Sequence, residues 1–176
     1  MRAAALLCAG ALALSGCGLK PLYSGGAGGP VQTMLAAVQV APIEGQSGWL
    51  VSNALRDRLQ AGETTPRYRL EVQLDDSIAG LGVRSDDSVA RERRTLRARY
   101  QLVDLSTGGV VLDATAGSDA GIDVVGSEYA TIAAEKTALE RLSGIVADQI
   151  VARVARFAQS GGKPATAPAS AGASGQ

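Results

Sequence analysis

The sequence predicts an α+β fold: a two-layer sandwich in which a four-stranded mixed sheet carries two helices on one face. Apolar and polar residues alternate along residues 68–78 and 91–102, as in strands with one buried face. Apolar residues recur at helical spacing along residues 47–61 and 127–157. The expected order is β-α-β-β-β-α, so the first two strands pair in parallel and the later strands form an antiparallel meander. Two helices cover only one face of such a sheet, which leaves the other face to water or to a partner.

The first expected strand covers residues 35–43, which read LAAVQVAPI, and Pro42 closes it. A helix is expected from Ser47, a candidate N-cap, to Ala61, with Gly62 as its stop. The side of this helix that is expected to enter the core is formed by Leu50, Val51, Ala54, Leu55 and Leu59.

The second expected strand, residues 68–78, places Tyr68 and its alternate neighbours on the core side. Residues 80–88 are rich in glycine and aspartate, which predicts a connection. A turn at residues 106–109 then separates the third strand from a fourth strand at residues 110–116.

The final helix is expected from Ser127, a candidate N-cap, to Phe157. Its core-facing residues fall within one arc of the helix and are Ile132, Leu139, Leu142, Val146, Ile150, Val154 and Phe157. Gly144 lies inside this helix, where glycine costs about 1 kcal/mol relative to alanine, so the sequence leaves open a kink or break there.

The third strand carries an arginine row on one of its sides, formed by Arg91, Arg93, Arg97 and Arg99. Its other side is able to enter a core and is formed by Leu96, Ala98, Tyr100 and Leu102. The arginine row is therefore expected on the uncovered face of the sheet, where Arg69 joins it.

Internal ion pairs are one explanation of the arginine row. The carboxylates expected on the same face are those of Glu71, Asp75 and Asp113. Cross-strand pairs of this kind are worth a few tenths of a kcal/mol each. With Arg69 included, five arginines face three carboxylates, which leaves a surplus of about two positive charges.

Two functional interpretations compete for this surplus. One is a protein partner, because arginine is enriched in interfaces. The other is an anionic glycolipid, whose phosphates suit the guanidinium fork. Single-stranded nucleic acid is excluded, because stacking needs exposed aromatic residues and Tyr100 faces the core. The sequence leaves open whether the row contacts lipid, partner or only neighbouring carboxylates.

The N-terminus, residues 1–16, has the anatomy of a lipoprotein signal peptide, with a basic start and an apolar run. The following Leu-Ser-Gly-Cys resembles a bacterial lipobox, which predicts cleavage before Cys17. The Cys17 thiol would then carry a diacylglyceryl group, and the new amino terminus would be acylated, for example by palmitate. Two or three such chains anchor a protein stably to a membrane, whereas a single chain does so only marginally.

The mature chain divides into three predicted parts. Residues 17–30 form the lipidated N-terminus and a glycine-rich flexible tether, and residues 31–157 form the folded domain. Residues 158–176 lack apolar periodicity and predict a disordered tail. Loss of Arg2 with the signal takes the 17 basic residues to 16 against 17 acidic ones, so bulk attraction to nucleic acid is not expected.

Catalysis finds little support in the residues. The chain has no histidine, and Cys8 leaves with the signal while Cys17 is expected to carry lipid. The commonest acid–base residue and thiol chemistry are therefore both missing from the mature chain. We expect no enzyme activity, no cofactor and no metal site.

The lipobox and the CGLKPLY stretch that begins at Cys17 resemble the start of the LPS-assembly lipoproteins of the LptE type, particularly their alphaproteobacterial branch. Later features fit the same family: VQVAPI before a helix, the alternating strand at residues 68–74, the arginine-rich strand that ends in YQL, and the long final helix. The resemblance covers nearly the whole mature chain.

This resemblance implies a lipoprotein anchored in the cell outer membrane and facing the periplasm. Such a protein plugs a large β-barrel partner of the LptD type, helps that barrel to assemble, and binds lipopolysaccharide or a related anionic glycolipid during delivery to the cell surface. Gly18, in place of aspartate, agrees with outer-membrane sorting. The alternative expectation is a generic periplasm-facing lipoprotein adaptor for another envelope complex.

Overall fold

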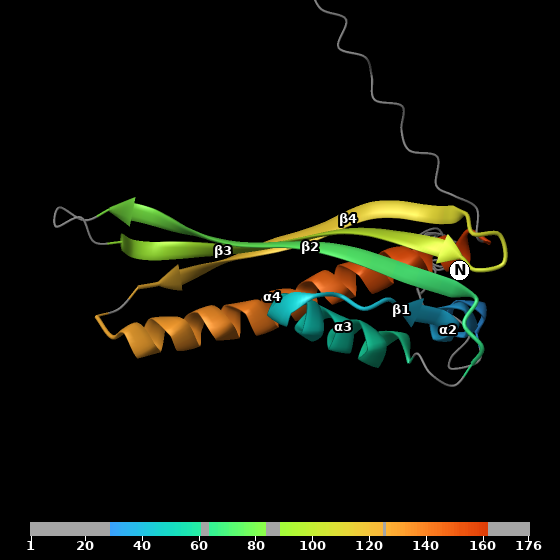
Figure 1. The fold of residues 1–176 in the computed structure, drawn as a ribbon, viewed down its shortest axis with the longest axis horizontal. Coiled ribbons are helices and arrows are strands. Elements are labelled where there is room, and N and C mark those ends of the chain that lie inside the picture. Colours follow the sequence, from blue (N-terminus) through green and yellow to red (C-terminus); the bar gives the residue numbers. More distant parts are fainter. Residues whose placement is uncertain (1–28, 61–63, 84–88, 125, 162–176) are drawn as a thin grey trace, which may run out of the picture.

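The computed structural model describes residues 29–60, 64–83, 89–124 and 126–161 of the 176-residue chain. Their helices and strands are, in order, α2 (Pro30–Ala36), β1 (Val38–Val40), α3 (Gly45–Leu59), β2 (Tyr68–Val83), β3 (Val89–Asp104), β4 (Val110–Asp123) and α4 (Glu128–Gln159). The strands form one layer and the helices lie against one face of it, which we call the inner face (Figure 1). The predicted α+β class, with a four-stranded mixed sheet, is confirmed.

The sheet has the strand order β1-β2-β3-β4. β1 pairs in parallel with β2, and Val38 lies opposite Tyr68. The β2–β3 and β3–β4 pairs are antiparallel, with Tyr100 of β3 between Val72 and Ala114. The parallel first pair and the antiparallel meander agree with the sequence prediction.

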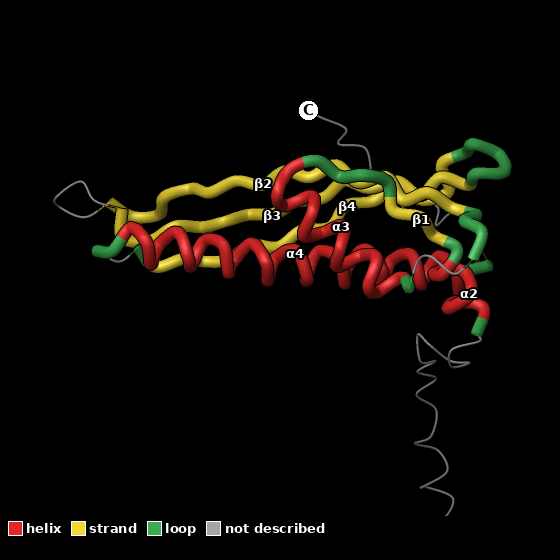
Figure 2. Tube along the Cα trace, turned by 60° about the horizontal axis from the view of Figure 1, so that its bottom comes forward, coloured by secondary structure: helices red, strands yellow, loops and turns green. Residues whose placement is uncertain are grey.

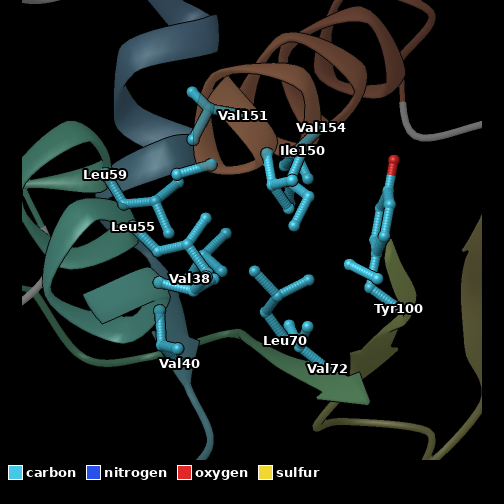
Figure 3. Packing of buried hydrophobic residues seen from close by; sticks show 14 of the residues in the cluster. Val38, Val40, Leu55, Leu59, Leu70, Val72, Tyr100, Ile150, Val151 and Val154 are labelled. Atoms are coloured by element: carbon cyan, nitrogen blue, oxygen red, sulfur yellow. The ribbon is translucent and has the colours of Figure 1, made fainter. Parts of the chain in front are cut away.

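The core lies between the inner face and the two longer helices. The residues gathered there in Figure 3 include Leu55 and Leu59 of α3, Ile150, Val151 and Val154 of α4, and Val38, Leu70 and Val72 of the sheet. Burial of each such side chain stabilises the fold by about 1.5–3 kcal/mol. The same contacts hold α3 and α4 side by side.

The three long strands extend beyond α3, and we call residues 76–83, 89–96 and 118–123 the distal half of the sheet. Among the described elements, only α4 covers the inner face there, and it runs along the length of the sheet (Figure 2). Two large apolar side chains in this region stay open to solvent: Ile78 is 42% exposed and Ile132 is 55% exposed. The distal half therefore has a thinner core than the rest of the molecule.

The predicted first strand is wrong at its N-terminal end. Leu35 lies in the helix α2, where it is buried, and the strand itself is only Val38–Val40. Pro30 stands in the first turn of α2, where its fixed φ and missing N–H favour a helix start. The apolar residues after Pro30 supply the buried side chains of a short helix and then of a short strand. This third helix lies on the same face as the other two.

The predicted boundaries of α3 are also corrected. Its N-cap is Glu44, so Ser47 lies inside the first turn and is not the cap. The helix ends at Leu59, and Gln60 takes a left-handed conformation with φ 52°. The predicted stop, Gly62, lies outside the described residues. The predicted core side is confirmed: Val51, Leu55 and Leu59 are buried, and Leu50 and Ala54 pack against them.

The strands β2 and β4 are longer than the sequence predicted. Residues 80–83 continue β2 instead of starting a connection, and β4 continues to Asp123 instead of ending near Ala116. The reason is β3, which pairs with both neighbours along its length and supports glycines such as Gly80 and Gly121 within the ladder. Residues 84–88 of the predicted connection lie outside the described residues.

Helix α4 begins after Ser127, as predicted, and continues without a break through Gly144 to Gln159. Its predicted core stripe is confirmed from Leu139 onward, where the members are buried. The assignment of Ile132 to the stripe is wrong, because its side chain is 55% exposed. Among the described helices, only α4 covers the distal half (Figure 2). The predicted signal peptide and most of the predicted tether and tail lie outside the described residues.

We predict that Gly144→Ala raises the free energy of unfolding by up to about 1 kcal/mol, because alanine is favoured over glycine inside a helix. The added Cβ would meet the Nη2 atom of Arg58 at 3.6 Å, an ordinary van der Waals contact. Urea denaturation of both proteins, followed by circular dichroism, measures the difference.

Gly48→Ala is the matched control, because Gly48 is also inside a helix. There the added Cβ would lie 2.6 Å from the carbonyl oxygen of Ile43. We expect this clash to lower the free energy of unfolding by about 1–3 kcal/mol. Similar effects of the two substitutions would contradict the packing described for α3 and α4.

Candidate binding face of the sheet

The arginine row lies on the outer face of the sheet, as predicted. Its four members are exposed, whereas Leu96, Ala98 and Tyr100 between and beside them are buried under the helices. The period of two along β3 produces this separation. The four guanidinium groups are therefore exposed on the face of the sheet that the described helices leave uncovered.

Carboxylates on the neighbouring strands engage most of these arginines. Arg99 lies 3.1 Å from Asp113, Arg91 lies 3.0 Å from Asp123, and Arg93 lies 3.7 Å from Asp119. On β2, Arg69 lies 2.7 Å from Glu71. These pairs are exposed, so each contributes only a few tenths of a kcal/mol to folding. They nevertheless occupy the guanidinium groups.

The predicted surplus of positive charge on this face is wrong. Because β4 continues to Asp123, it adds Asp119 and Asp123 to the three carboxylates that the sequence placed there. Five carboxylates therefore face the five arginines, and the formal charges of the outer face balance. The number of arginines alone gives no reason for an external anion to bind.

Arg97 is the exception within the row. It lies opposite Asp75 of β2 and Gly117 of β4 in the ladder. Its guanidinium forms no hydrogen bond or ion pair within the described part of the chain. A hollow of about 530 Å³ surrounds it and is lined by Asp75, Arg99 and Thr115, among others. Arg97 can thus accept an external anion without giving up a partner.

Gly117 brings Arg97 close to the backbone of β4. A Cβ at Gly117 would lie 3.2 Å from the carbonyl oxygen of Leu96 and 3.3 Å from Cγ of Arg97. The missing side chain therefore leaves the space in which the stem of Arg97 rests. At Gly117 the lining of the hollow is backbone, because glycine has no side chain.

The ion pair between Arg99 and Asp113 shifts the pKa of both partners. Hydrogen bonds from Arg99 and then Gln101, with the charge of Arg99, lower the pKa of Asp113. The hydrogen bond to Asp113 raises the pKa of Arg99 in turn. Gln101 donates to the same Asp113 oxygen, Oδ2, at 2.9 Å. Asp113 is therefore shared between two donors of β3.

The sequence analysis missed Arg94, which lies on the inner face. Its Nε and Nη2 donate to the two carboxylate oxygens of Asp76 at 2.9 and 2.7 Å, and Nη1 donates to the carbonyl oxygen of Glu135 at 3.1 Å. The side chains of Arg94 and Asp76 are only 13% and 20% exposed. The contact ties α4 to the distal half of the sheet. Residue parity could have found it, because Arg94 shares a side with Leu96.

Three other sequence predictions concern lipid, membranes and metals. Cys17, the predicted lipid attachment site, lies outside the described residues. Of the helices that the structure describes, none is long and apolar enough to cross a membrane. Among the described residues, no group of three or more histidine, cysteine or acidic side chains is arranged to hold a metal ion.

Comparison with known proteins identifies a family. The LptE family model, whose description is lipopolysaccharide-assembly, matches residues 35–154, well over half of the chain. This range contains α3, the whole sheet and most of α4. No curated protein matches the chain.

Solved structures share the fold. A candidate lipoprotein from Caulobacter crescentus is 25% identical, with a TM-score of 0.63, over 78% of this chain and 100% of that chain. Uncharacterized lipoprotein B from Nitrosomonas europaea is 13% identical, with a TM-score of 0.54, over 72% and 90% of the two chains. Rare lipoprotein B from Shewanella oneidensis is 11% identical, with a TM-score of 0.51, over 69% and 98%. The last two similarities show the fold alone.

Asp76→Asn is predicted to lower the free energy of unfolding by roughly 1–3 kcal/mol, because it weakens a half-buried, bidentate, charge-assisted contact. The matched control is Asp119→Asn, which alters an exposed pair 3.7 Å long and should cost less than about 0.5 kcal/mol. Chemical denaturation compares the two variants. An equal cost would mean that Arg94 does not tie α4 to the sheet.

Proposed function

The chain belongs to the LptE lipopolysaccharide-assembly family, and on this premise we propose that it is a non-enzymatic outer-membrane lipoprotein of the lipopolysaccharide translocon. It plugs a β-barrel partner of the LptD type, assists the assembly of that barrel and helps to deliver lipopolysaccharide to the cell surface. The family match over residues 35–154 carries this proposal.

The shape of the molecule supports a role as a plug. All the described helices lie on the inner face of the sheet, so the outer face is a broad polar surface that no described element covers (Figure 1). Its arginines and carboxylates alternate and balance, which suits the mixed polar lining of a barrel better than an apolar partner surface. The sheet also keeps its own core apart from this surface, so binding need not disturb folding.

The lipid anchor belongs to the proposal as well. Cys17, at the start of the mature chain, is proposed to carry fatty acyl groups and to hold the protein at the periplasmic face of the outer membrane. Residues 17–30 are the proposed tether, and the described chain enters the fold through α2, at the end away from the distal half (Figure 1). The distal half would then project away from the anchor.

Within the arginine row, the balance of charge suggests unequal roles. Arg91, Arg93 and Arg99 must exchange an internal carboxylate for any external anion. Arg97 forms no such ion pair among the described residues, although Asp75 lines the same hollow on the outer face. We therefore assign to Arg97 the first contact with a lipid phosphate or with a carboxylate of the barrel.

Purification from native membranes tests the partner. The full-length lipoprotein with a C-terminal tag, extracted in a mild nonionic detergent, is expected to bring down an outer-membrane β-barrel protein in comparable amount. Mass spectrometry identifies this companion and measures the N-terminal peptide of the same sample. A different companion, with no barrel protein, would favour the generic adaptor, and an unmodified peptide that begins at Met1 would contradict the anchor.

Single substitutions test the arginine row. Arg97→Gln is expected to weaken lipopolysaccharide or barrel binding by about tenfold, because one charge-assisted contact is worth roughly 1.5–3 kcal/mol. Arg91→Gln is the matched control on the same strand, and its effect should be less than about threefold, because Asp123 already engages that side chain. Binding is measured with purified lipopolysaccharide and with the barrel protein. Unchanged binding in Arg97→Gln and in the variant lacking all four arginines would limit the row to internal ion pairing.

A further inference from the structure

A second hollow lies around the edge of the sheet, between β4 and the C-terminal half of α4, and we call it the β4–α4 groove. Its volume is about 720 Å³. The residues that matter for its chemistry are Tyr100 of β3, Thr115 of β4, and Gln149, Arg153 and Arg156 of α4. No member of the arginine row lines it.

The groove holds cations that lack carboxylate partners. Arg153 and Arg156 come from one side of α4, three residues apart, and face the same space. Arg153 has no hydrogen bond or ion pair within the described residues. Arg156 donates only to the carbonyl oxygen of Ala152, at 3.3 Å, so most of its donors are free.

Two carboxylates also line the groove, but other arginines neutralise them. Asp113 accepts hydrogen bonds from Arg99 and Gln101 on the outer face. Asp148 accepts two hydrogen bonds from Arg58 of α3. These carboxylates are therefore not available to Arg153 and Arg156. Unlike the outer face, where arginines and carboxylates are equal in number, the groove keeps about two uncompensated positive charges.

Tyr100 provides an independent indication of a ligand. The residue is only 2% exposed, yet its hydroxyl points away from the apolar cluster in Figure 3 and reaches the groove. Within the described residues this hydroxyl has no hydrogen-bond partner. Burial raises the pKa of Tyr100, and the charges of Arg153 and Arg156 oppose that increase. The Tyr100 hydroxyl is therefore a donor that opens into the groove beside Arg153 and Arg156 and has no acceptor among the described residues.

The edge of β4 adds donors to the same wall. The N–H of Gly117 donates to Oε1 of Gln149 at 3.0 Å, and Nε2 of Gln149 donates to the Gly117 carbonyl oxygen at 3.3 Å. Gly117 thus turns its peptide groups toward α4, and by the strand's period of two Thr115 does the same. The N–H of Thr115 therefore borders the groove at the open edge of β4.

We propose that the β4–α4 groove binds a phosphate group, held by Arg153 and Arg156 from the helix and by the hydroxyl of Tyr100 and the N–H of Thr115 from the sheet. Guanidinium forks suit the several oxygens and the double charge of a phosphate. The groove is much larger than one phosphate and falls within the range of ligand pockets, about 300–1,000 Å³. The bound species is therefore a phosphorylated molecule, either a lipid headgroup or a free phosphate ester. This inference does not rest on the proposed function, because the groove shares no arginine with the row.

The test uses the full mature lipoprotein in a nonionic detergent and three probes: inorganic phosphate, glycerol phosphate, and mixed micelles that contain phosphatidic acid. Calorimetric titration is expected to give saturable binding of at least one probe. Arg153→Gln with Arg156→Gln should weaken that binding by about a hundredfold or more, since two charge-assisted contacts are lost. Tyr100→Phe should weaken it by a few-fold. Circular dichroism verifies that each variant is folded.

The control is Lys136→Gln with Arg141→Gln, which removes the same charge from exposed positions of α4 that do not line the groove. This pair should leave the titration unchanged. Selective loss of glycerol phosphate binding in the groove variant supports a free ester, and selective loss of micelle binding supports a headgroup. Equal losses in both pairs, no saturable binding of any probe, or tighter binding of an acidic peptide than of every phosphate probe would overturn the proposal. Lipopolysaccharide binding that fails in Arg97→Gln but survives in the groove variant would separate the two sites.

Discussion

The burial of one side of β3 is the constraint on which the rest of the structure depends. β3 pairs with β2 along one edge and with β4 along the other, and its residues Leu96, Ala98 and Tyr100 lie beneath the helices. Successive side chains of a strand point to opposite faces, so this burial commits Arg97 and Arg99 to the outer face. A register shift of one residue would exchange the two sets and place arginines in the core. The apolar side of the strand thus determines the charged surface.

A count of arginines on a surface is a poor measure of its capacity for anions. On the outer face Arg99 already has Asp113 as a partner, and external anions must compete with it. Within the two hollows, Arg97 and Arg153 have no partner among the described residues. These two hollows meet at the edge of β4, because Thr115 and Gln149 line both. Both candidate binding sites therefore lie at the edge of β4.

Sequence patterns predicted the parallel and antiparallel strand pairings, and local period predicted the outward arginines and the stripe of α4 from Leu139 onward. The predictions failed where the structure depends on contacts between segments that are distant in the sequence. Ile132 fits the helical stripe, but no second helix in the described part of the chain reaches the distal half to bury it. The length of β4 depends on its pairing with β3, and that length brought Asp119 and Asp123 into the balance of charge. The β4–α4 groove could not be predicted, because Tyr100 and the arginines of α4 meet only in the folded chain.

The double hydrogen bond between Gln149 and the backbone of Gly117 bears on the resistance of the chain to aggregation. A sheet is open at its lateral strands, and unpaired peptide groups there recruit other chains into aggregates. At the opposite margin β1 covers only residues 68–70 of β2, and on β4 the amide of Gln149 stands in for one residue of a neighbouring strand. The side chain interrupts the long open edge near its midpoint, so an intruding strand cannot pair continuously along it. One side chain of α4 thus protects the edge of β4 against such pairing.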